Sequence, residues 1–407
     1  MKLKVLHSSD WHLGRLLYGR KRTDEFKQFL TWLGQVIINE EIDILLIAGD
    51  IFDTSTPNNQ AQALYYQFLR QIIGSCCRHI VIIAGNHDSP HFLTAPQDLL
   101  KILNVHVIGL IEIDLADEVI VLNNAQGKAE CIICAVPYLR DKELRKMQTG
   151  ESIKDKDQQL IHNIEAHYKA VGTLAAEKRQ ALNLNIPIIG MGHLFSAGAK
   201  TLIDDGVREL YIGSLGHLGA DIFPACFDYL ALGHLHIPQA INKEPFKRYS
   251  GSPIAIGFGE AKQQKSICLI EFTQNQPELT LKSIPIFQKL RQIKGDWEQI
   301  HNALKRYIKE NKSIWIEIIY QGQEVKTDLY QQIEKIIKDS PLEILRIQNK
   351  QFHQQSLQPI ALDERLDNLT PMAVFERCLN AQEIPTSQQQ SLKKHFKEIC
   401  QTIENLN

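Results

Sequence analysis

The sequence lacks long apolar runs. None of its apolar segments approaches the roughly 18–20 uninterrupted residues that a membrane-spanning helix needs. Its first residues, MKLKVLHSSDWHLG, turn polar almost at once and leave no room for the apolar stretch of a secretion signal. We therefore expect a cytoplasmic protein with no membrane partner.

The chain also has no excess of charge of either sign. Its 407 residues carry a formal net charge of −2, and 23% charged with 44% hydrophobic residues is the composition of a soluble globular protein. Such a balance predicts neither a nucleic-acid partner nor a membrane surface, although a neutral total is compatible with a local basic patch. The length exceeds what one ordinary core holds, so two or three domains are expected.

Cysteine spacings typical of zinc or redox sites are scarce. Of the eight cysteines, Cys131 and Cys134, in ECIICAVPY, have C-x-x-C spacing. They lie in an apolar run typical of a strand, in which residues i and i+3 face opposite sides of the sheet. We interpret them as core residues, and metal or redox chemistry is the less favoured alternative.

The first 280 residues alternate apolar runs with amphipathic runs. The apolar runs predict buried strands, and the amphipathic runs predict helices at 23–41 (opened by a Thr-Asp cap), 58–75 (closed by a glycine) and about 154–182. Strand–helix alternation with apolar strands predicts an α/β fold with two sheets packed face to face and helices outside.

The pattern changes near Pro285. Strand, helix, strand, helix and strand are predicted in turn over 290–295, 296–310, 313–321, 328–339 and 342–350. After a Gln-rich stretch, Thr370-Pro371 and Thr386 open two short amphipathic helices. We divide the chain into a first domain at 1–283, a small α+β domain at 284–350, and a linker with C-terminal helices at 351–407.

Five polar clusters follow apolar strands. The clusters are SSDWH (Asp10, His12), AGDIFD (Asp50, Asp53), AGNHD (Asn86, His87, Asp88), GMGH (His193) and ALGHLH (His234, His236). The carboxyl ends of strands are where active sites collect in α/β sheets. Carboxylate, imidazole and amide donors suit Mn²⁺, Fe²⁺ or Zn²⁺ better than an all-oxygen Mg²⁺ or Ca²⁺ site.

The number of donors indicates two metal ions. A single strand-end Asp or His is more often a turn former or a hydrogen-bonded histidine, but five such clusters together favour metal binding. Seven donors exceed the needs of one ion with open positions, whereas one shared carboxylate gives two four-ligand sites. Asp50 is the natural bridge because its two oxygens can each bind a metal. Two adjacent ions activate a water and stabilise charge during displacement at phosphorus.

The ordered set D-x-H, G-D-x-x-D, G-N-H-D, G-H and G-H-x-H resembles the calcineurin-like metallophosphoesterases. The longer stretches HSSDWHLGR, AGDIFD, AGNHDSP, VPYLR and LALGHLH…YSGSP are similar to one branch, the SbcD-type nucleases of double-strand-break repair. The resemblance is clear over about residues 1–280 and looser beyond. It implies a four-layer metallophosphoesterase sandwich, two sheets flanked by helices, followed by a small α+β capping domain and C-terminal helices.

The resemblance also implies a role for each donor. One metal falls on Asp10, His12, Asp50 and His236, and the second on Asp50, Asn86, His193 and His234. His87 is implied to contact the scissile phosphate and to stabilise or protonate the departing oxygen. Asp53 and Asp88 are implied to orient these groups, with a capping or turn role as the alternative for both.

The implied activity is that of a Mn²⁺-dependent DNA nuclease, an exonuclease on duplex ends and an endonuclease on hairpins and single strands. The implied partner is an SbcC-type coiled-coil ATPase in a heterotetramer, with homodimerisation through helices at about 58–73 and 90–103. The C-terminal helices are implied to dock on the ATPase, and a hairpin packed on its own domain is the alternative. Residues 286–350 are only slightly basic, which fits either DNA contact or a solvated face.

Two other functions remain open. A small-molecule phosphodiesterase or protein phosphatase uses the same fold, but a phosphatase is expected to carry G-D-x-x-D-R-G and G-N-H-E. Here Thr54 and Ser55 follow Asp53, and Asp88 stands in place of the glutamate. A non-catalytic scaffold with a vestigial site is expected to have lost a ligand, and all seven ligand positions are intact.

Overall fold

The computed structural model describes residues 2–144, 153–196, 219–322 and 328–349, together with Met372, Phe375, Glu376, Leu379, Lys393 and Phe396. The chain forms two compact units, Met1–Lys289 and Leu290–Asn407. The division into domains at 283 and 350 stays a prediction. In the described part of the chain no helix has the length and hydropathy needed to cross a membrane.

Two six-stranded sheets form the centre of the first unit. Its strands are β1 (Lys2–Ser8), β4 (Ile44–Ala48), β5 (His79–Ile83), β6 (Val105–Ile108), β7 (Val119–Asn123), β8 (Ala129–Ala135), β9 (Ile188–His193), β10 (Tyr229–Gly233), β11 (Gln239–Ala240), β12 (Lys247–Tyr249), β13 (Ser266–Thr273) and β14 (Gln276–Ser283). The first sheet has the order β14-β13-β1-β4-β5-β6 and the second β11-β12-β10-β9-β8-β7. A separate hairpin joins β2 (Leu16–Leu17) to β3 (Arg20–Lys21).

The middle of each sheet is parallel. Strands β1, β4, β5 and β6 run together in the first sheet, and β8, β9, β10 and β12 in the second. Strands β13, β14, β7 and β11 pair antiparallel at the edges. Parallel strands bring their carboxyl ends to one edge of the sheet, so residues that follow β1, β4, β5, β9 and β10 collect there.

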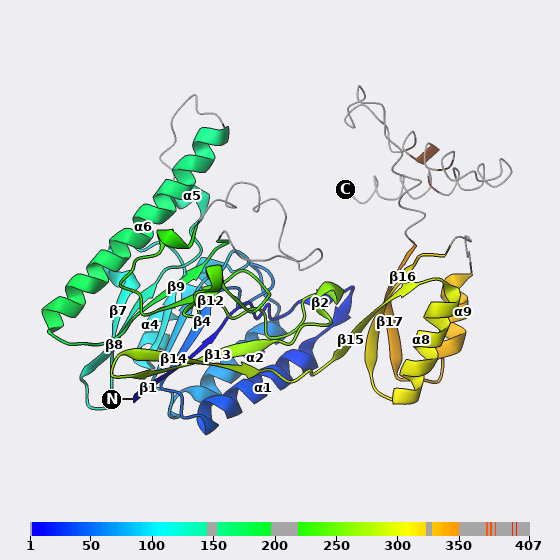
Figure 1. Ribbon diagram of the computed structural model, residues 1–407, viewed down its shortest axis with the longest axis horizontal. Coiled ribbons are helices and arrows are strands. Elements are labelled where there is room, and N and C mark those ends of the chain that lie inside the picture. The colour runs from blue at the N-terminus through cyan, green and yellow to red at the C-terminus, as the bar shows by residue number, and fades with distance from the viewer. Residues whose placement is uncertain are drawn as a thin grey trace. The chain divides into compact units, whose positions relative to one another are not determined.

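Helices cover the outer face of each sheet. They are α1 (Thr23–Asn39), α2 (Asn59–Ile72), α3 (Pro90–Thr94), α4 (Gln97–Ile102), α5 (Asp141–Leu144) and α6 (Ile153–Leu182), with short 3₁₀ turns η1 (Leu115–Glu118), η3 (Ala220–Ile222), η4 (Ile241–Lys243) and η5 (Phe258–Glu260). Helices α1 to α4 share a core with the first sheet and α6 with the second (Figure 1). The predicted α/β sandwich of two sheets flanked by helices is confirmed.

Both faces of the central strands are buried. On β4, Leu46 packs between the two sheets, whereas its neighbour Leu45 packs against the helices outside the first sheet. Each such leucine contributes roughly 1.5–3 kcal/mol by leaving water. Because neither face meets solvent, the strands read as continuous apolar runs, and only their polar ends interrupt the pattern.

Two local predictions were wrong. Thr23 is the first residue of α1 rather than its cap, and the N-cap residue Arg22 makes no side-chain capping bond. The Arg22 guanidinium is buried and instead bonds the Glu25 carboxylate and the carbonyl of Ala255. The helix predicted at about 90–103 is two short helices, because Pro96 lacks the N–H needed to continue the first.

The second unit has its own three-stranded sheet and core. Its elements are β15 (Lys289–Gly295), α8 (Trp297–Glu310), β16 (Ile314–Tyr320), α9 (Leu329–Ile337) and β17 (Leu342–Asn349), in the order that the sequence predicted. The sheet order is β15-β16-β17, with β16 and β17 parallel. A capping box between Asp296 and Gln299 opens α8, whose apolar face packs on the sheet.

Most of the predicted C-terminal helices lie outside the described residues. Among those described, the rings of Phe375 and Phe396 stack with centroids 4.0 Å apart, and Lys393 pairs with Glu376 at 2.9 Å. The two segments therefore contact one another. Docking of this region on an ATPase stays a prediction.

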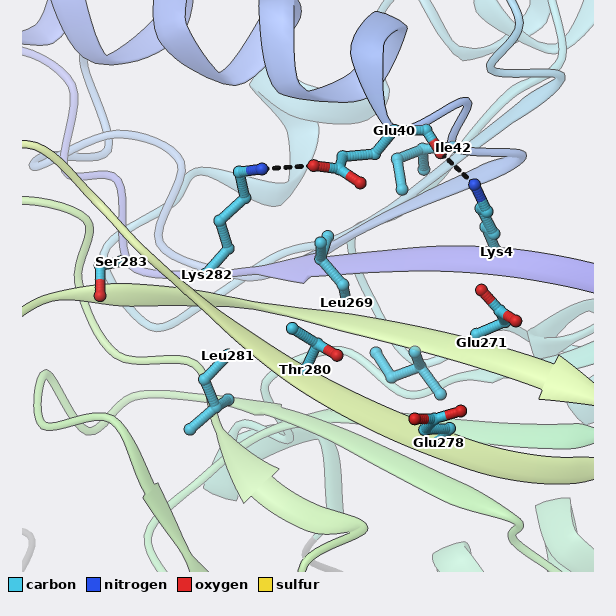
Figure 2. A pocket seen from close by; sticks show the side chains of 11 residues that line it. Lys4, Glu40, Ile42, Leu269, Glu271, Glu278, Thr280, Leu281, Lys282 and Ser283 are labelled. Atoms are coloured by element: carbon cyan, nitrogen blue, oxygen red, sulfur yellow. Dashed lines mark hydrogen bonds and ion pairs between the residues drawn. The ribbon is translucent and has the colours of Figure 1, made fainter.

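A pocket of about 390 Å³ lies where the β13–β14 hairpin meets the end of α1 (Figure 2). Lys282 of β14 forms an ion pair with Glu40, and Lys4 Nζ donates to the Glu40 carbonyl at 2.7 Å. These lysines complement the end of α1, whose last turn has no basic residue of its own. Because Lys4 stands near the start of β1, this pocket lies at the opposite end of the strand from the polar clusters.

Candidate metal centre

Four of the predicted ligands have an uncommon backbone conformation. Asp10, His12, Asp50 and His234 have positive φ angles of 53°, 48°, 51° and 103°. Such angles cost on the order of 1–3 kcal/mol for each residue and persist where surrounding contacts impose them. Here the Asp10 N–H donates to the Gly49 carbonyl at 3.0 Å, and the His12 N–H to the Asp50 carbonyl at 2.9 Å. The turns after β1 and β4 therefore hold each other in place.

Two glycines allow these turns to pack closely. A Cβ atom on Gly85 would lie 2.1 Å from Asp50 Oδ1, and one on Gly233 would lie 1.8 Å from the Ala48 carbonyl oxygen. Neither space admits a side chain. Gly85 thus lets the turns after β4 and β5 of the first sheet pack together, and Gly233 lets the two sheets approach at the donor-bearing edge.

Asp10, His12 and His236 form one set of adjacent donors, called the first donor group below. Their ligand atoms all lie within 4.8 Å of one another, and all three side chains are buried. The Nε2 atoms of His12 and His236 are 3.2 Å apart although the residues are 224 positions apart in the chain. Strand β1 of one sheet and β10 of the other therefore deliver these donors to one point.

Asn86, His193 and His234 form the second donor group. Asn86 Oδ1 lies 3.0 Å from His193 Nε2 and 3.0 Å from His234 Nδ1. The His193 and His234 rings meet edge to face, with centroids 5.3 Å apart. These donors follow β5, β9 and β10, so both sheets again contribute.

Asp50 lies between the two groups. Its Oδ2 atom is 3.5 Å from His12 Nε2 and 3.3 Å from His193 Nε2. Its Oδ1 atom accepts the backbone N–H of His87 at 2.9 Å. A single oxygen thus faces both groups, whereas the sequence led us to expect one oxygen for each metal.

The charges at this edge suit a cation. Burial alone raises the pKa of Asp50, but the neighbouring His193 outweighs it and brings that pKa well below its usual range. In turn Asp50 overcomes the effect of burial on His193 and raises its pKa to about 9. Burial and His193 lower the pKa of His234 to about 3. Without a metal ion, His193 therefore keeps a proton at a place where several lone pairs point toward one another. Such an arrangement favours a divalent ion, and these residues fit a metal centre.

His87 stands beside the donors. Its Nδ1 atom donates to the main-chain carbonyl of Asp53 at 2.8 Å, and its ring meets the His12 ring edge to face at 4.8 Å. The Asp53 carboxylate lies 3.4 Å from His12 Nδ1 and accepts from Arg15 at 2.9 Å. Burial raises the pKa of Asp53, but His12 and Arg15 outweigh it and lower it to about 2. Asp53 thus holds two imidazoles, one through its backbone and one through its side chain.

Asp88 bonds the main chain. Its buried carboxylate accepts the N–H groups of Gly85 at 2.9 Å, Ile51 at 3.1 Å and Phe52 at 2.9 Å. Burial and the charge of Asp50 raise its pKa to about 6. In the structure Asp88 joins the turn after β4 to the turn after β5, which fixes the positions of Asp50 and His87.

Sequence reasoning missed the groups behind His236. The Glu260 carboxylate lies 3.5 Å from His236 Nδ1, and the Lys265 ammonium donates to that carboxylate at 2.6 Å. Burial raises the pKa of Glu260, but Lys265 and His236 outweigh it and lower it to about 2. Both residues stand in GFGEAKQQKS, where a Glu and a Lys five apart read as surface charges. No spacing in the sequence distinguishes this buried pair.

Comparison with protein families agrees with this site. Residues 3–238 match the calcineurin-like phosphoesterase family, and residues 286–383 match the family described as the type 5 capsule protein repressor C-terminal domain. The first match holds every donor described above. The chain belongs to the calcineurin-like phosphoesterase family, whose members are divalent-metal hydrolases.

Curated relatives narrow the class. The chain is 31% identical over 404 residues, 98% of each chain, to the SbcD component of the nuclease SbcCD from Escherichia coli strain K12. It is 32% identical to the Bacillus subtilis strain 168 protein of the same name over 66% of each chain, and 27% identical to that of Staphylococcus epidermidis over 96% of this chain and 97% of the relative. The resemblance to the SbcD branch is confirmed.

Proposed function

We propose that this chain is the metal-dependent DNA nuclease subunit of an SbcCD-type complex. It hydrolyses phosphodiester bonds by a two-metal mechanism, as an exonuclease on duplex ends and an endonuclease on hairpins and single strands, in DNA replication, recombination and repair. One observation carries the proposal. Asp50 presents a single oxygen to both donor groups, in a chain that matches a component of a nuclease over 98% of its length.

The proposed ligands are those that the resemblance implied. One ion takes Asp10, His12, Asp50 and His236, and the other takes Asp50, Asn86, His193 and His234. Two divalent ions held by these residues would supply the positive charge that lowers the pKa of an attacking water and offsets the negative charge of the phosphate. We propose Mn²⁺, because mixed carboxylate and imidazole donors suit a borderline metal.

His87 supplies the proton for the departing oxygen. Because its Nδ1–H donates to the Asp53 carbonyl, its Nε2 atom is the one left to face substrate. In the protonated ring Nε2–H donates to the oxygen that leaves phosphorus, and after transfer Nε2 holds a lone pair. Asp53 fixes this orientation from behind, and Asp88 fixes the turn that carries His87.

The proposed partners are DNA, a second copy of this chain and an SbcC-type coiled-coil ATPase. Two copies of this chain and two of the ATPase give a cytoplasmic heterotetramer. Exposed apolar side chains on α2 and α4 support the homodimer: Tyr66 is 39% exposed, Leu99 63% and Ile102 80%. Large apolar side chains exposed on these two helices are what a protein–protein contact through them would cover. Residues 284–350 are proposed as the capping domain that follows the DNA phosphates.

The test is a nuclease assay on an end-labelled hairpin duplex with Mn²⁺, with and without the ATPase partner and ATP. We expect hairpin opening and shortening of duplex ends, and loss of both on chelation. Hydrolysis of bis-p-nitrophenyl phosphate without DNA cleavage under any of these conditions would contradict the proposal. That outcome would favour a small-molecule phosphodiesterase.

A further inference from the structure

Behind His236 lies a buried charged network that the mechanism above does not use. Glu260 is fully buried and Lys265 is 6% exposed. Glu260 Oε1 lies 3.5 Å from His236 Nδ1, and Glu260 Oε2 accepts from Lys265 Nζ at 2.6 Å and from the Ile256 N–H at 3.0 Å. A carboxylate and an ammonium are thus enclosed together directly behind one proposed ligand.

The network determines which ring nitrogen of His236 carries a proton. Glu260 and Lys265 balance each other's charge, so a neutral His236 leaves the enclosed group electrically neutral. The carboxylate beside Nδ1 favours a hydrogen there, which leaves the lone pair on Nε2. Nε2 is the atom that faces His12 Nε2 at 3.2 Å. The carboxylate behind the ring therefore favours the tautomer in which Nε2, the atom that faces the first donor group, can bind a metal.

The same network also fixes the backbone of His236. Lys265 Nζ donates to the His236 carbonyl at 2.8 Å and to Ser252 Oγ at 3.0 Å. The Ser252 N–H donates to the same carbonyl at 3.2 Å. The ring and the main chain of His236 are therefore both held in place. The groups that hold them stand 16 to 29 positions later in the chain.

Energetics argue against a role in stability alone. Enclosing an ion pair costs desolvation that its attraction repays only in part, and apolar pairs of similar volume are often as stable. A carboxylate on the far nitrogen of a ligand histidine, in contrast, commonly raises metal affinity by about 10–100-fold. We propose that Glu260 and Lys265 are positioning residues that orient His236 toward the ion of the first donor group. This inference rests on the proposed metal ligands.

Two double variants separate the hydrogen-bond acceptor from the charge. Glu260→Gln with Lys265→Met keeps an acceptor behind His236, whereas Glu260→Leu with Lys265→Met removes it. Mn²⁺ binding is measured by calorimetric titration of the metal-free full chain. We expect the Gln variant to bind both ions within about threefold of the unaltered protein. The Leu variant should lose about 10–100-fold in one site and stay within about threefold in the other.

Glu118 provides a matched control. It forms another buried carboxylate–histidine pair, with His167 at 2.8 Å, on the helix side of the second sheet. Glu118→Gln should change the melting temperature and leave both Mn²⁺ affinities unchanged. Equal affinities in both double variants, or equal losses at both sites, would overturn the assignment to His236.

A spectroscopic measurement covers the case in which the Leu variant does not fold. With Co²⁺ in place of Mn²⁺, the visible absorption of the Glu260→Gln/Lys265→Met protein should shift, because a neutral amide replaces the charged acceptor. The Glu118→Gln spectrum should not shift. An unshifted spectrum in the first variant overturns the inference. Absence of metal binding by the unaltered protein would instead overturn the proposed ligands, so the two failures are distinguishable.

Discussion

The two donor groups are supported in different ways. In the first group each imidazole has a carboxylate behind its far nitrogen, from Asp53 or from Glu260. In the second group His193 Nδ1 instead donates to the main-chain carbonyl of Ala48 at 2.9 Å. Support by side chains can be altered by substitution without moving a strand, whereas support by the main chain belongs to the fold. The first site is thus open to tuning, and the second is fixed by the sheet.

Removal of the shared oxygen should impair metal binding by both donor groups and so have the largest effect. Asp50→Ala removes the one atom that faces both groups, so we expect loss of both ions and a fall in cleavage of about 1000-fold or more. Metal analysis of the purified protein gives the stoichiometry. Asp43→Ala is the matched control, because Asp43 precedes the same strand β4 at its other end and bonds Arg78. Two ions per chain in Asp50→Ala would show that the bridging role is wrong.

His87 should be needed for catalysis but not for metal binding by either donor group. We expect His87→Ala to lower DNA cleavage by about 10²–10⁴-fold, because a positioned proton donor contributes that much. Both ions should remain bound in metal analysis, since the His87 side chain is not among the proposed ligands. Retained cleavage would contradict the assigned role.

His234 and His236 should separate the two groups. Each single change to alanine should reduce the metal content from two ions to one, and the double change should reduce it to none. Paramagnetic resonance of the remaining Mn²⁺ should differ between the single variants, because the remaining ion then has different neighbours. Identical spectra, or loss of the same ion in both, would mean that the two histidines serve one site.

The smallest expected effect is a pH dependence of stability to which His193 of the second group contributes. Asp50 raises the pKa of His193 to about 9 against an ordinary value of 6.5. The stability that this proton provides is complete below pH 6.5 and is lost as pH rises to about 9, at most about 3 kcal/mol. His234 and Asp88, with pKa values of about 3 and about 6, have already titrated by then. Melting temperatures of metal-free protein over pH 6–10 test this. The loss of stability between pH 6.5 and 9 should be smaller in His193→Gln than in the unaltered protein, and equal losses would contradict the contribution of His193.

The proximity of the proposed ligands was predictable from sequence. Parallel strands bring their carboxyl ends to one edge of the sheet. Polar residues at the ends of apolar runs, such as Asp10, Asn86 and His193, therefore indicate a common edge. The sandwich followed from the same runs because strands buried on both faces lack alternation. Both predictions use short-range patterns only.

Other features depend on distant contacts and were not predictable. Glu260 reads as a surface residue until the fold places it behind His236, which lies far earlier in the chain. The start of α1 depends on a bond from Arg22 to the carbonyl of Ala255, which stands 233 positions further on. Which oxygen of Asp50 faces both donor groups depends on the rotation of one carboxylate. A sequence specifies such details only through the completed fold.

The proposed ligands lie far apart in the sequence, and this has a consequence for the synthesis of the protein in the cell. The ribosome makes Asp10 early, yet His236, which follows strand β10 of the second sheet, is made more than two hundred residues later. A chain that ends before His236 therefore has only part of the donor set. The full set of donors is present only after most of the first unit has been made.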